Sequence, residues 1–262
     1  MKRRSRRALL VGAATGAAGV TGLTIAGKTL LNAADTRVSS EAIRQCSATP
    51  VQDILNITVT LERLAVTFYS NTLAHAHTLG IGSADQLYLK AALIEEQLHA
   101  HFFEQVGGKA LISIFSFPKG PATFTNLTTF IITQQQIEGL FDSVYLCAVR
   151  EFAMQDRLDL AQSAAQIACI EAEHRLIGRL IGRMQPAEGR PQASPTGAGS
   201  SLADNWSFAP IIFSSVGDAA GIIQQAGYFN PIPNNLFPYH PAPTDDPNIT
   251  YRSPFAVSCP SS

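Results

Sequence analysis

One pattern occurs twice in the sequence and restricts the fold more than any other feature: a glutamate followed, at nearly the same distance in both copies, by a Glu-x-x-His motif. The residues of the pattern are Glu62, Glu96 and His99 in the first copy, and Glu138, Glu171 and His174 in the second copy. In each copy a tyrosine follows the first glutamate by seven residues, and a glycine follows the second glutamate by eleven. Such self-similarity indicates that one structural unit, a pair of helices, is present twice.

The helical spacing of these residues directs all of them towards one interior. Residues three apart lie on one face of an α-helix, so each Glu-x-x-His motif presents a carboxylate and an imidazole to the same spot. Glu62 and Glu138 each lie on the apolar stripe of a predicted helix and therefore point into the core. Four buried carboxylates would repel one another, whereas two divalent cations would balance their charge and the histidines would add nitrogen ligands. The pattern therefore predicts a carboxylate-bridged di-iron or dimanganese site.

The segment that contains the repeat, residues 51–183, is predicted to be all-α because apolar residues recur there with helical spacing. A break is expected near Gln155, since Asp156 followed by Asp159 can cap a new helix and a 40-residue helix would be unusual. The predicted helices span about 51–78, 84–106, 123–153 and 157–183. Residues 107–122 can extend about 50 Å, which exceeds the length of about 35 Å expected for a 23-residue helix. This connection can therefore cross the whole bundle.

With these motifs, residues 50–183 resemble the ferritin-like superfamily, most closely the secreted ferritin-like domain proteins that include the desiccation-related proteins. The resemblance implies a ferritin-like four-helix bundle at residues 51–183, with a long crossover between helices 2 and 3, which would run parallel. It also implies two iron or manganese ions as cofactors. The fold hosts many functions, so the resemblance alone does not identify a reaction.

The resemblance also implies a role for each ligand. Glu96 and Glu171 would be the bridging carboxylates, and the leading glutamate of each copy would be a terminal ligand. Glu95 would orient His174 from outside the ligand set, whereas the equivalent position in the other copy is Ile170. The two repeated tyrosines are interpreted as core residues rather than redox-active groups.

Residues 1–34 are typical of an export signal, with five positive charges in the first seven residues followed by a Gly/Ala-rich apolar stretch. Residues 5–10 read Ser-Arg-Arg-Ala-Leu-Leu, which resembles the twin-arginine translocation motif. We expect export to the periplasm or the extracellular space and cleavage after Ala33 or Ala34. The alternative is an uncleaved signal, and only then would the protein contact the membrane. Residues 35–50 are predicted to be a linker.

Residues 184–262 are predicted to form a Pro-rich irregular C-terminal tail with one short helix at about 216–227. Twelve of the fifteen prolines fall after Met184, alongside only seven charged side chains. The tail is rich in aromatic residues, so we expect parts of it to pack on the bundle or on a neighbouring subunit, which allows a homo-oligomer. A disulfide between Cys46 and Cys259 is an open alternative for an exported protein.

Charge argues against a nucleic-acid partner, because the chain after the predicted signal carries 13 basic and 20 acidic residues, a net charge of −7. The leading hypothesis is an exported redox protein whose dimetal centre reacts with dioxygen or peroxide as a small-molecule substrate. Ferroxidase, peroxidase and manganese-catalase activities all fit the ligand set, and the resemblance suggests a role in oxidative or desiccation stress. The competing hypothesis is a non-enzymatic bundle, metal-stabilised or metal-free, that protects surfaces or binds a partner.

Overall fold

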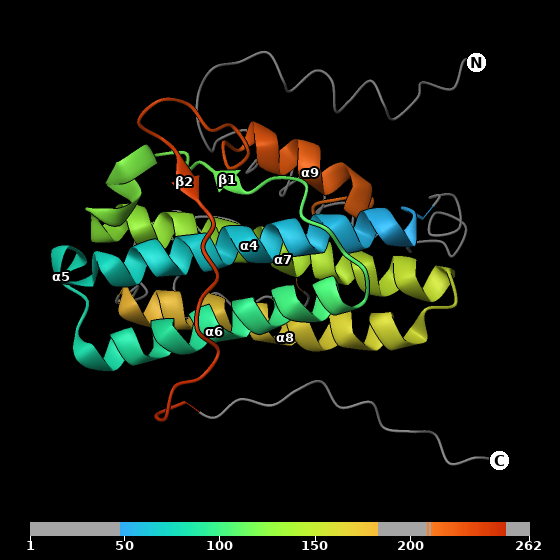
Figure 1. Ribbon diagram of the computed structural model, residues 1–262, viewed down its shortest axis with the longest axis horizontal. Helices are drawn as coiled ribbons and strands as arrows, with labels where there is room; N and C mark the ends of the chain where they lie inside the picture. The colour runs from blue at the N-terminus through green and yellow to red at the C-terminus, as the bar shows by residue number, and fades with distance from the viewer. Residues whose placement is uncertain (1–47, 183–208, 210, 250–262) are drawn as a thin grey trace, which may run out of the picture. The chain divides into compact units, whose positions relative to one another are not determined.

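The computed structural model describes residues 48–182, 209 and 211–249 (Figure 1). The predicted export signal, Cys46 and Cys259 lie outside the described residues. Within them the chain is all-α, apart from one small ladder of two short strands. No helix in this part of the chain combines the length and the apolar character needed to cross a membrane.

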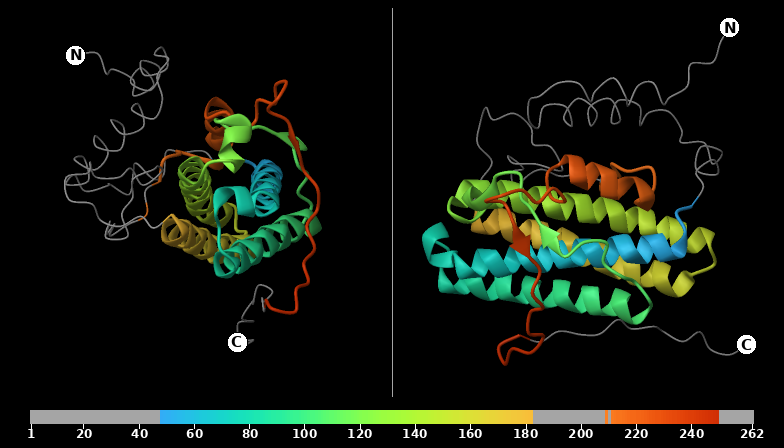
Figure 2. Two further views of the ribbon diagram at one scale, coloured as in Figure 1. Left: turned by 90° about the vertical axis from the view of Figure 1, so that its left-hand side faces the viewer. Right: turned by 45° about the horizontal axis from the view of Figure 1, so that its top comes forward.

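Four long helices form a bundle. Their bounds are Val51–Ala74 (α4), Ser83–Gln105 (α6), Leu127–Met154 (α7) and Leu158–Ile181 (α8). α4 packs along α6 and α7 packs along α8, so each copy of the repeat is one helical hairpin. Residues 106–126 cross the length of the bundle, and α6 and α7 therefore run in the same direction (Figures 1 and 2). The predicted bundle with a long crossover between its second and third helices is confirmed.

The first predicted helix, 51–78, is interrupted near its C-terminal end. α4 ends at Ala74 with His75 as its cap, and a one-turn helix, α5 (Ala76–Leu79), follows. Gly80 closes this turn with a φ of 70°, in the left-handed region that favours glycine. The chain can therefore reverse within a few residues and start α6.

α7 begins at Leu127 rather than at residue 123. The preceding residues form a 3-10 helix, η1 (Gly120–Phe124), which contains a proline in its first turn. Asn126 is the N-cap of α7, and its side-chain oxygen accepts a hydrogen bond of 2.9 Å from the backbone N–H of Thr129. This cap satisfies one of the free N–H groups at the start of the helix and places its first residue.

The break between α7 and α8 lies where it was expected, but Asp156 does not cap α8. Asp156 adopts a φ of 57°, and the N-cap of α8 is Arg157, which has no capping side-chain hydrogen bond. The backbone N–H of Arg157 instead donates to the carbonyl oxygen of Phe152 at 2.9 Å, closing the end of α7. The left-handed residue, rather than a carboxylate cap, therefore ends the helix.

The described part of the tail packs on the bundle of its own chain. The short helix α9 (Val216–Gln225) lies against α4 and α7. The strand β2 (Phe237–Pro238) pairs antiparallel with β1 (Ile114–Phe115) of the crossover. Aromatic rings from α4, the crossover, α7 and the tail form one cluster, the buried Phe68, Phe117, Phe124 and Phe130 and the partly buried Phe237, with neighbouring centroids 4.9–5.9 Å apart. These contacts hold the tail and the crossover on the same face of the bundle.

Beyond β2 the tail runs across α4 and α6 (Figures 1 and 2). The Tyr239 hydroxyl donates a hydrogen bond of 3.1 Å to Oε1 of Gln97, and the backbone N–H of Ala242 donates to the same oxygen at 2.8 Å. The guanidinium of Arg63 lies 4.7 Å from the centroid of the Tyr239 ring. The tail is thus fastened beside the helices that carry the first copy of the repeat.

Candidate metal centre

The six residues of the repeated pattern meet inside the bundle. α4 and α7 contribute one glutamate each, and α6 and α8 contribute one Glu-x-x-His motif each. They form two overlapping sets, which we call the His99 group (Glu62, Glu96, His99 and Glu171) and the His174 group (Glu96, Glu138, Glu171 and His174). In each group, one ligand atom per residue lies within 4.8 Å of the others. Either group could hold a cation.

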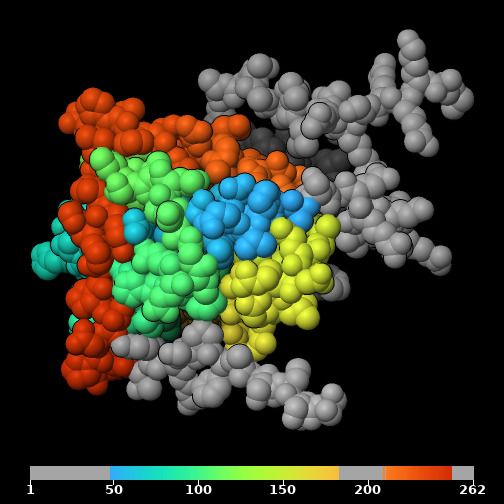
Figure 3. Space-filling view, turned by 45° about the vertical axis from the view of Figure 1, so that its right-hand side comes forward, coloured from blue at the N-terminus to red at the C-terminus, as the bar shows by residue number. Residues whose placement is uncertain are grey.

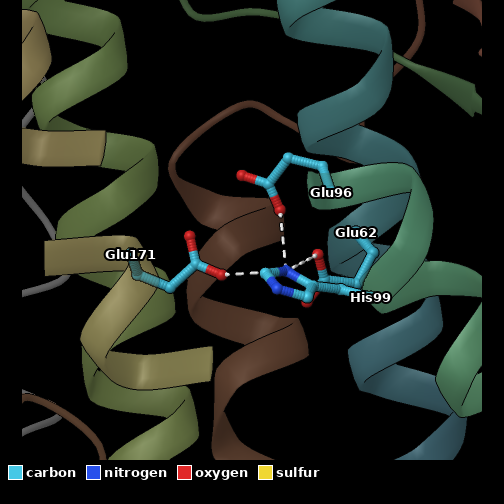
Figure 4. A group of neighbouring side chains, drawn as sticks. All are labelled: Glu62, Glu96, His99 and Glu171. Carbon is cyan, nitrogen blue, oxygen red and sulfur yellow. Dashed lines mark ion pairs between the residues drawn. The ribbon is translucent and has the colours of Figure 1, made fainter. Parts of the chain in front are cut away.

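Glu96 and Glu171 lie between the two imidazoles and belong to both groups. Glu96 places Oε1 3.1 Å from Nδ1 of His174 and Oε2 3.5 Å from Nδ1 of His99. Glu171 places Oε2 3.4 Å from Nδ1 of His174 and Oε1 3.6 Å from Nδ1 of His99. Figure 4 shows the three carboxylates that surround His99. Because each shared carboxylate directs one oxygen to each imidazole, both are oriented to bridge two cations.

The two leading glutamates each face one imidazole. Oε2 of Glu62 lies 3.5 Å from Nδ1 of His99, and Oε2 of Glu138 lies 3.8 Å from Nδ1 of His174. All four carboxylates are fully buried, and so is His174, whereas 14% of the His99 side chain is exposed. Of the six residues, His99 is therefore the one nearest to solvent, although its Nδ1 is itself buried.

Burial and crowding shift the protonation of the centre. Burial, together with the neighbouring carboxylates, raises the pKa of Glu62 and of Glu171 well above 4.5. Burial also acts against ionisation of Glu96, but the two imidazoles beside it outweigh burial and lower the pKa of that carboxyl group. Burial lowers the pKa of His174, but Tyr69 and the surrounding carboxylates outweigh it and leave the pKa well above 6.5. The metal-free centre therefore retains protons that a cation would displace.

The buried donors of the centre fit a divalent metal. Among the described residues, neither carboxylate oxygen of Glu62, Glu96 or Glu171 has a hydrogen-bond partner. The same holds for Oε2 of Glu138 and for Nδ1 of both histidines. Leaving so many buried polar atoms unpaired is costly, and a metal ion would satisfy them together. A set of four carboxylates and two imidazoles suits iron or manganese in charge and in donor type.

Three further residues surround the His174 group. Nε2 of His174 lies 2.9 Å from Oε2 of Glu95, so the contact predicted between these residues is present. The Tyr69 hydroxyl donates a hydrogen bond to Oε1 of Glu138. Gln134 donates from Nε2 to the carbonyl oxygen of His174 at 2.7 Å and lies 3.3 Å from the Tyr69 hydroxyl. Tyr69 is buried in the core as predicted, but its hydroxyl also contacts the centre, which sequence reasoning missed.

A buried ion pair also adjoins the His174 group. Asp142, one turn after Glu138 on α7, accepts a hydrogen bond of 2.8 Å from Nη1 of Arg175, which follows His174 on α8. Burial raises the pKa of Asp142 to about 6, although the Arg175 guanidinium acts in the opposite direction. Sequence reasoning missed this pair. The signal was an acidic residue on the same apolar stripe as Glu138, four residues away.

Other acidic residues near the motifs lie elsewhere. Glu151 is buried at one end of the bundle, where its carboxylate accepts the backbone N–H groups of Thr49 at 3.1 Å and Val216 at 3.2 Å. It joins the start of α4 to α7 and α9, and Figure 3 shows this end of the molecule, where α4 lies beside α9. Glu173 is exposed on α8. Both are therefore separate from the ligand set.

Comparison with known proteins agrees with this geometry. The family profile of the ferritin-like domain matches residues 51–181, which include all four long helices and every residue of the centre. Neither the curated proteins nor the solved structures gave a match. The profile match spans half of the chain, and its bounds coincide with the start of α4 and the end of α8. The chain therefore belongs to the ferritin-like domain family.

Proposed function

We propose that the protein is exported and holds two iron or manganese ions in a carboxylate-bridged centre that reacts with dioxygen or peroxide. The observation that carries the proposal is the placement of Glu96 and Glu171, each of which directs one oxygen to each imidazole. Their four oxygens have no hydrogen-bond partner in the described part of the chain. The leading glutamate and the histidine of each copy would complete one metal position each.

Two redox-active ions, when bound, supply the shared electron change that reduction of dioxygen or peroxide requires. The chain itself contributes position and environment. Glu95 accepts a hydrogen bond from the Nε2–H group of His174, which would leave Nδ1 to bind a metal ion in place of its proton. Tyr69 holds Oε1 of Glu138, so that Oε2 faces His174. The surrounding apolar core excludes water from the four carboxylates.

Export and a stress role belong to the same proposal and rest on the sequence. The twin-arginine-like signal supports transport to the periplasm or beyond, and this route is known for carrying folded proteins that already hold their metal. The resemblance to the desiccation-related proteins supports a role in oxidative or desiccation stress. A homo-oligomer through the tail is compatible with this role.

Metal analysis and peroxide turnover on one preparation test the proposal. The purified protein should hold close to two transition-metal ions per chain and consume peroxide or dioxygen with iron or with manganese. Replacing Glu96 and Glu171 together by Ala should abolish both properties, whereas Glu173→Ala, on the exposed side of α8, should preserve them. Metal binding without turnover would instead support the non-enzymatic alternative, a metal-stabilised bundle with a protective or partner-binding role. Full metal occupancy in the double variant would contradict the site.

A further inference from the structure

The internal repeat allows the two halves of the centre to be compared residue by residue. Both halves offer the same ligands: one leading glutamate, one histidine and the two shared carboxylates. Any difference between the two metal positions must therefore come from the residues around the ligands. The repeat places each surrounding residue of one half in register with a counterpart in the other, 75 or 76 positions away.

The two leading glutamates differ in the hydrogen bonds that their carboxylates accept. Oε1 of Glu138 accepts the Tyr69 hydroxyl, whereas neither oxygen of Glu62 has a hydrogen-bond partner among the described residues. The counterpart of Tyr69 is Tyr145, whose ring stacks on Phe103 with centroids 6.0 Å apart. The Tyr145 hydroxyl is buried and makes no hydrogen bond within the described part of the chain. In the part of the chain that the structure describes, a second residue thus holds Glu138 in place and none holds Glu62.

The histidines differ in the same direction. Glu95 fixes Nε2 of His174 at 2.9 Å, and the residue in register with Glu95 in the other copy is the apolar Ile170. His174 is fully buried, while 14% of the His99 side chain reaches solvent. Glu95 therefore holds the orientation of the His174 imidazole, and no residue in the described part of the chain holds Nε2 of His99 in the same way.

Residues farther from the ligands also differ between the two groups. The Asp142–Arg175 pair beside the His174 group corresponds to Val66 and Ala100 beside the His99 group, and both of these are buried and apolar. Gln134, which donates to the carbonyl oxygen of His174, corresponds to Thr58, whose hydroxyl bonds, within the described residues, only to carbonyl oxygens of its own helix. Hydrogen-bonding residues outside the ligand set are thus concentrated around the His174 group, although both groups have the same kinds of ligand.

We propose that the two metal positions are unequal, with the His174 group binding the first ion tightly and the His99 group binding a second ion more weakly and exchanging it. The inference rests on the proposed function and adds an order of filling to it. Ligands that are already held in their binding orientation lose less freedom when a metal binds. Outer residues of this kind change metal affinity by about 10- to 100-fold. The partly exposed side chain of His99 marks the side on which the second ion would enter and leave.

Titration of the metal-free full chain with Mn²⁺ alone tests the order of filling. Calorimetry should show two steps whose dissociation constants differ by about 10-fold or more. Electron paramagnetic resonance at one equivalent of Mn²⁺ should show isolated ions, and coupled pairs should appear only with the second equivalent. His99→Ala should remove the weak step and keep the tight one, whereas His174→Ala should remove the tight step. Coupled pairs at one equivalent would overturn the inference, as would two steps of equal affinity.

A matched pair of variants tests whether the surrounding hydrogen bonds cause the difference in affinity between the two metal positions. Tyr69→Phe removes the hydroxyl that holds Glu138 and should weaken the tight step by about 10-fold. Tyr145→Phe removes a hydroxyl that has no hydrogen-bond partner among the residues the structure describes, and should leave both steps unchanged. Glu95→Ile copies the residue in register in the other half and should also bring the two steps closer. Circular dichroism would verify that each variant folds. Equal effects of the two tyrosine variants would overturn the inference while leaving the metal site intact, whereas a chain that binds neither Mn²⁺ nor Fe²⁺ would contradict the proposed function as well.

Discussion

The carboxylate of Glu96 lies 3.1 Å from the imidazole of His174, although the two residues are far apart in the sequence. Glu96 belongs to the first helical hairpin and His174 to the second, so this contact joins the two copies of the repeat. The same carboxylate reaches His99 through its other oxygen at 3.5 Å. The centre is therefore shared between the hairpins, and neither hairpin holds a complete metal position by itself.

The stability of the metal-free protein should fall as the pH rises above about 5. The pKa of Glu62 and of Glu171 is raised above 4.5, so above that pH the unfolded chain releases protons that the folded chain retains. His174, with its pKa raised above 6.5, contributes stability that is lost as the pH rises through the folded-state value. Glu96 acts oppositely, because its pKa is lowered in the folded state. The stability that it contributes is present at neutral pH and is lost only at acidic pH, below the ordinary pKa of a glutamate.

Thermal unfolding from pH 5 to pH 8, with and without metal, measures this dependence. The melting temperature of the metal-free protein should fall over this range, by about 2–4 °C for each kcal/mol lost. The metal-loaded protein should show little of this fall, because the cations replace the protons. Glu62→Gln should flatten the curve of the metal-free protein. Parallel curves for the two forms would contradict the assignment of the shifted groups.

Glu138→Gln should impair turnover without unfolding the bundle. The substitution keeps the shape and removes one negative charge, so metal binding should weaken more at the His174 group than at the His99 group. Turnover of dioxygen or peroxide should fall by orders of magnitude, because both ions are needed to share the electron change. Helical content should be unchanged, since one fewer buried carboxylate also means less repulsion. Metal analysis, turnover and circular dichroism measured together would show this, and undiminished turnover would exclude Glu138 from the centre.

Gly178→Ala should disturb the His174 group from outside. A Cβ atom at this position would clash with Oε1 of Gln134, the side chain that donates to the carbonyl oxygen of His174. We expect a loss of about 1–3 kcal/mol in the free energy of unfolding, measured with denaturant, and weaker binding of the first metal ion. The control is Gly221→Ala on α9, where the added Cβ would meet no described atom within 4 Å beyond its chain neighbours and the nearby backbone of α9. That variant should be neutral or gain up to about 1 kcal/mol, because alanine favours the helix.

Arg6→Lys combined with Arg7→Lys should leave the protein in the cytoplasm. The twin-arginine receptor is expected to recognise the planar guanidinium pair, which lysine cannot reproduce although it keeps the charge. Cell fractionation and immunoblotting of the wild type and the double variant would measure export. If export were unchanged, the N-terminal segment would act as an ordinary secretory signal.

The residues that face the bundle interior could be predicted from the sequence, because a helix repeats its faces every three or four residues whatever it packs against. That rule identified all six residues that the structure brings together, from Glu62 to His174. The resemblance to ferritin-like proteins implied the crossover, and residues 107–122 are long enough to return to the opposite end of the bundle. Local spacing did not decide the start of α7 at Leu127, which depends on the cap formed by Asn126.

Contacts between helices were decided only by the tertiary structure. Tyr69 and Tyr145 occupy equivalent places in the repeat, yet only the hydroxyl of Tyr69 has a partner among the described residues. Asp142 meets Arg175 from another helix, and Tyr239 reaches Gln97 from the tail. A hydrogen bond requires two groups to lie within about 3 Å of each other, and a small rotation or axial shift of one helix against another breaks it. Spacing along one helix determines the face on which a residue lies, whereas the packing of several helices determines which residue it meets.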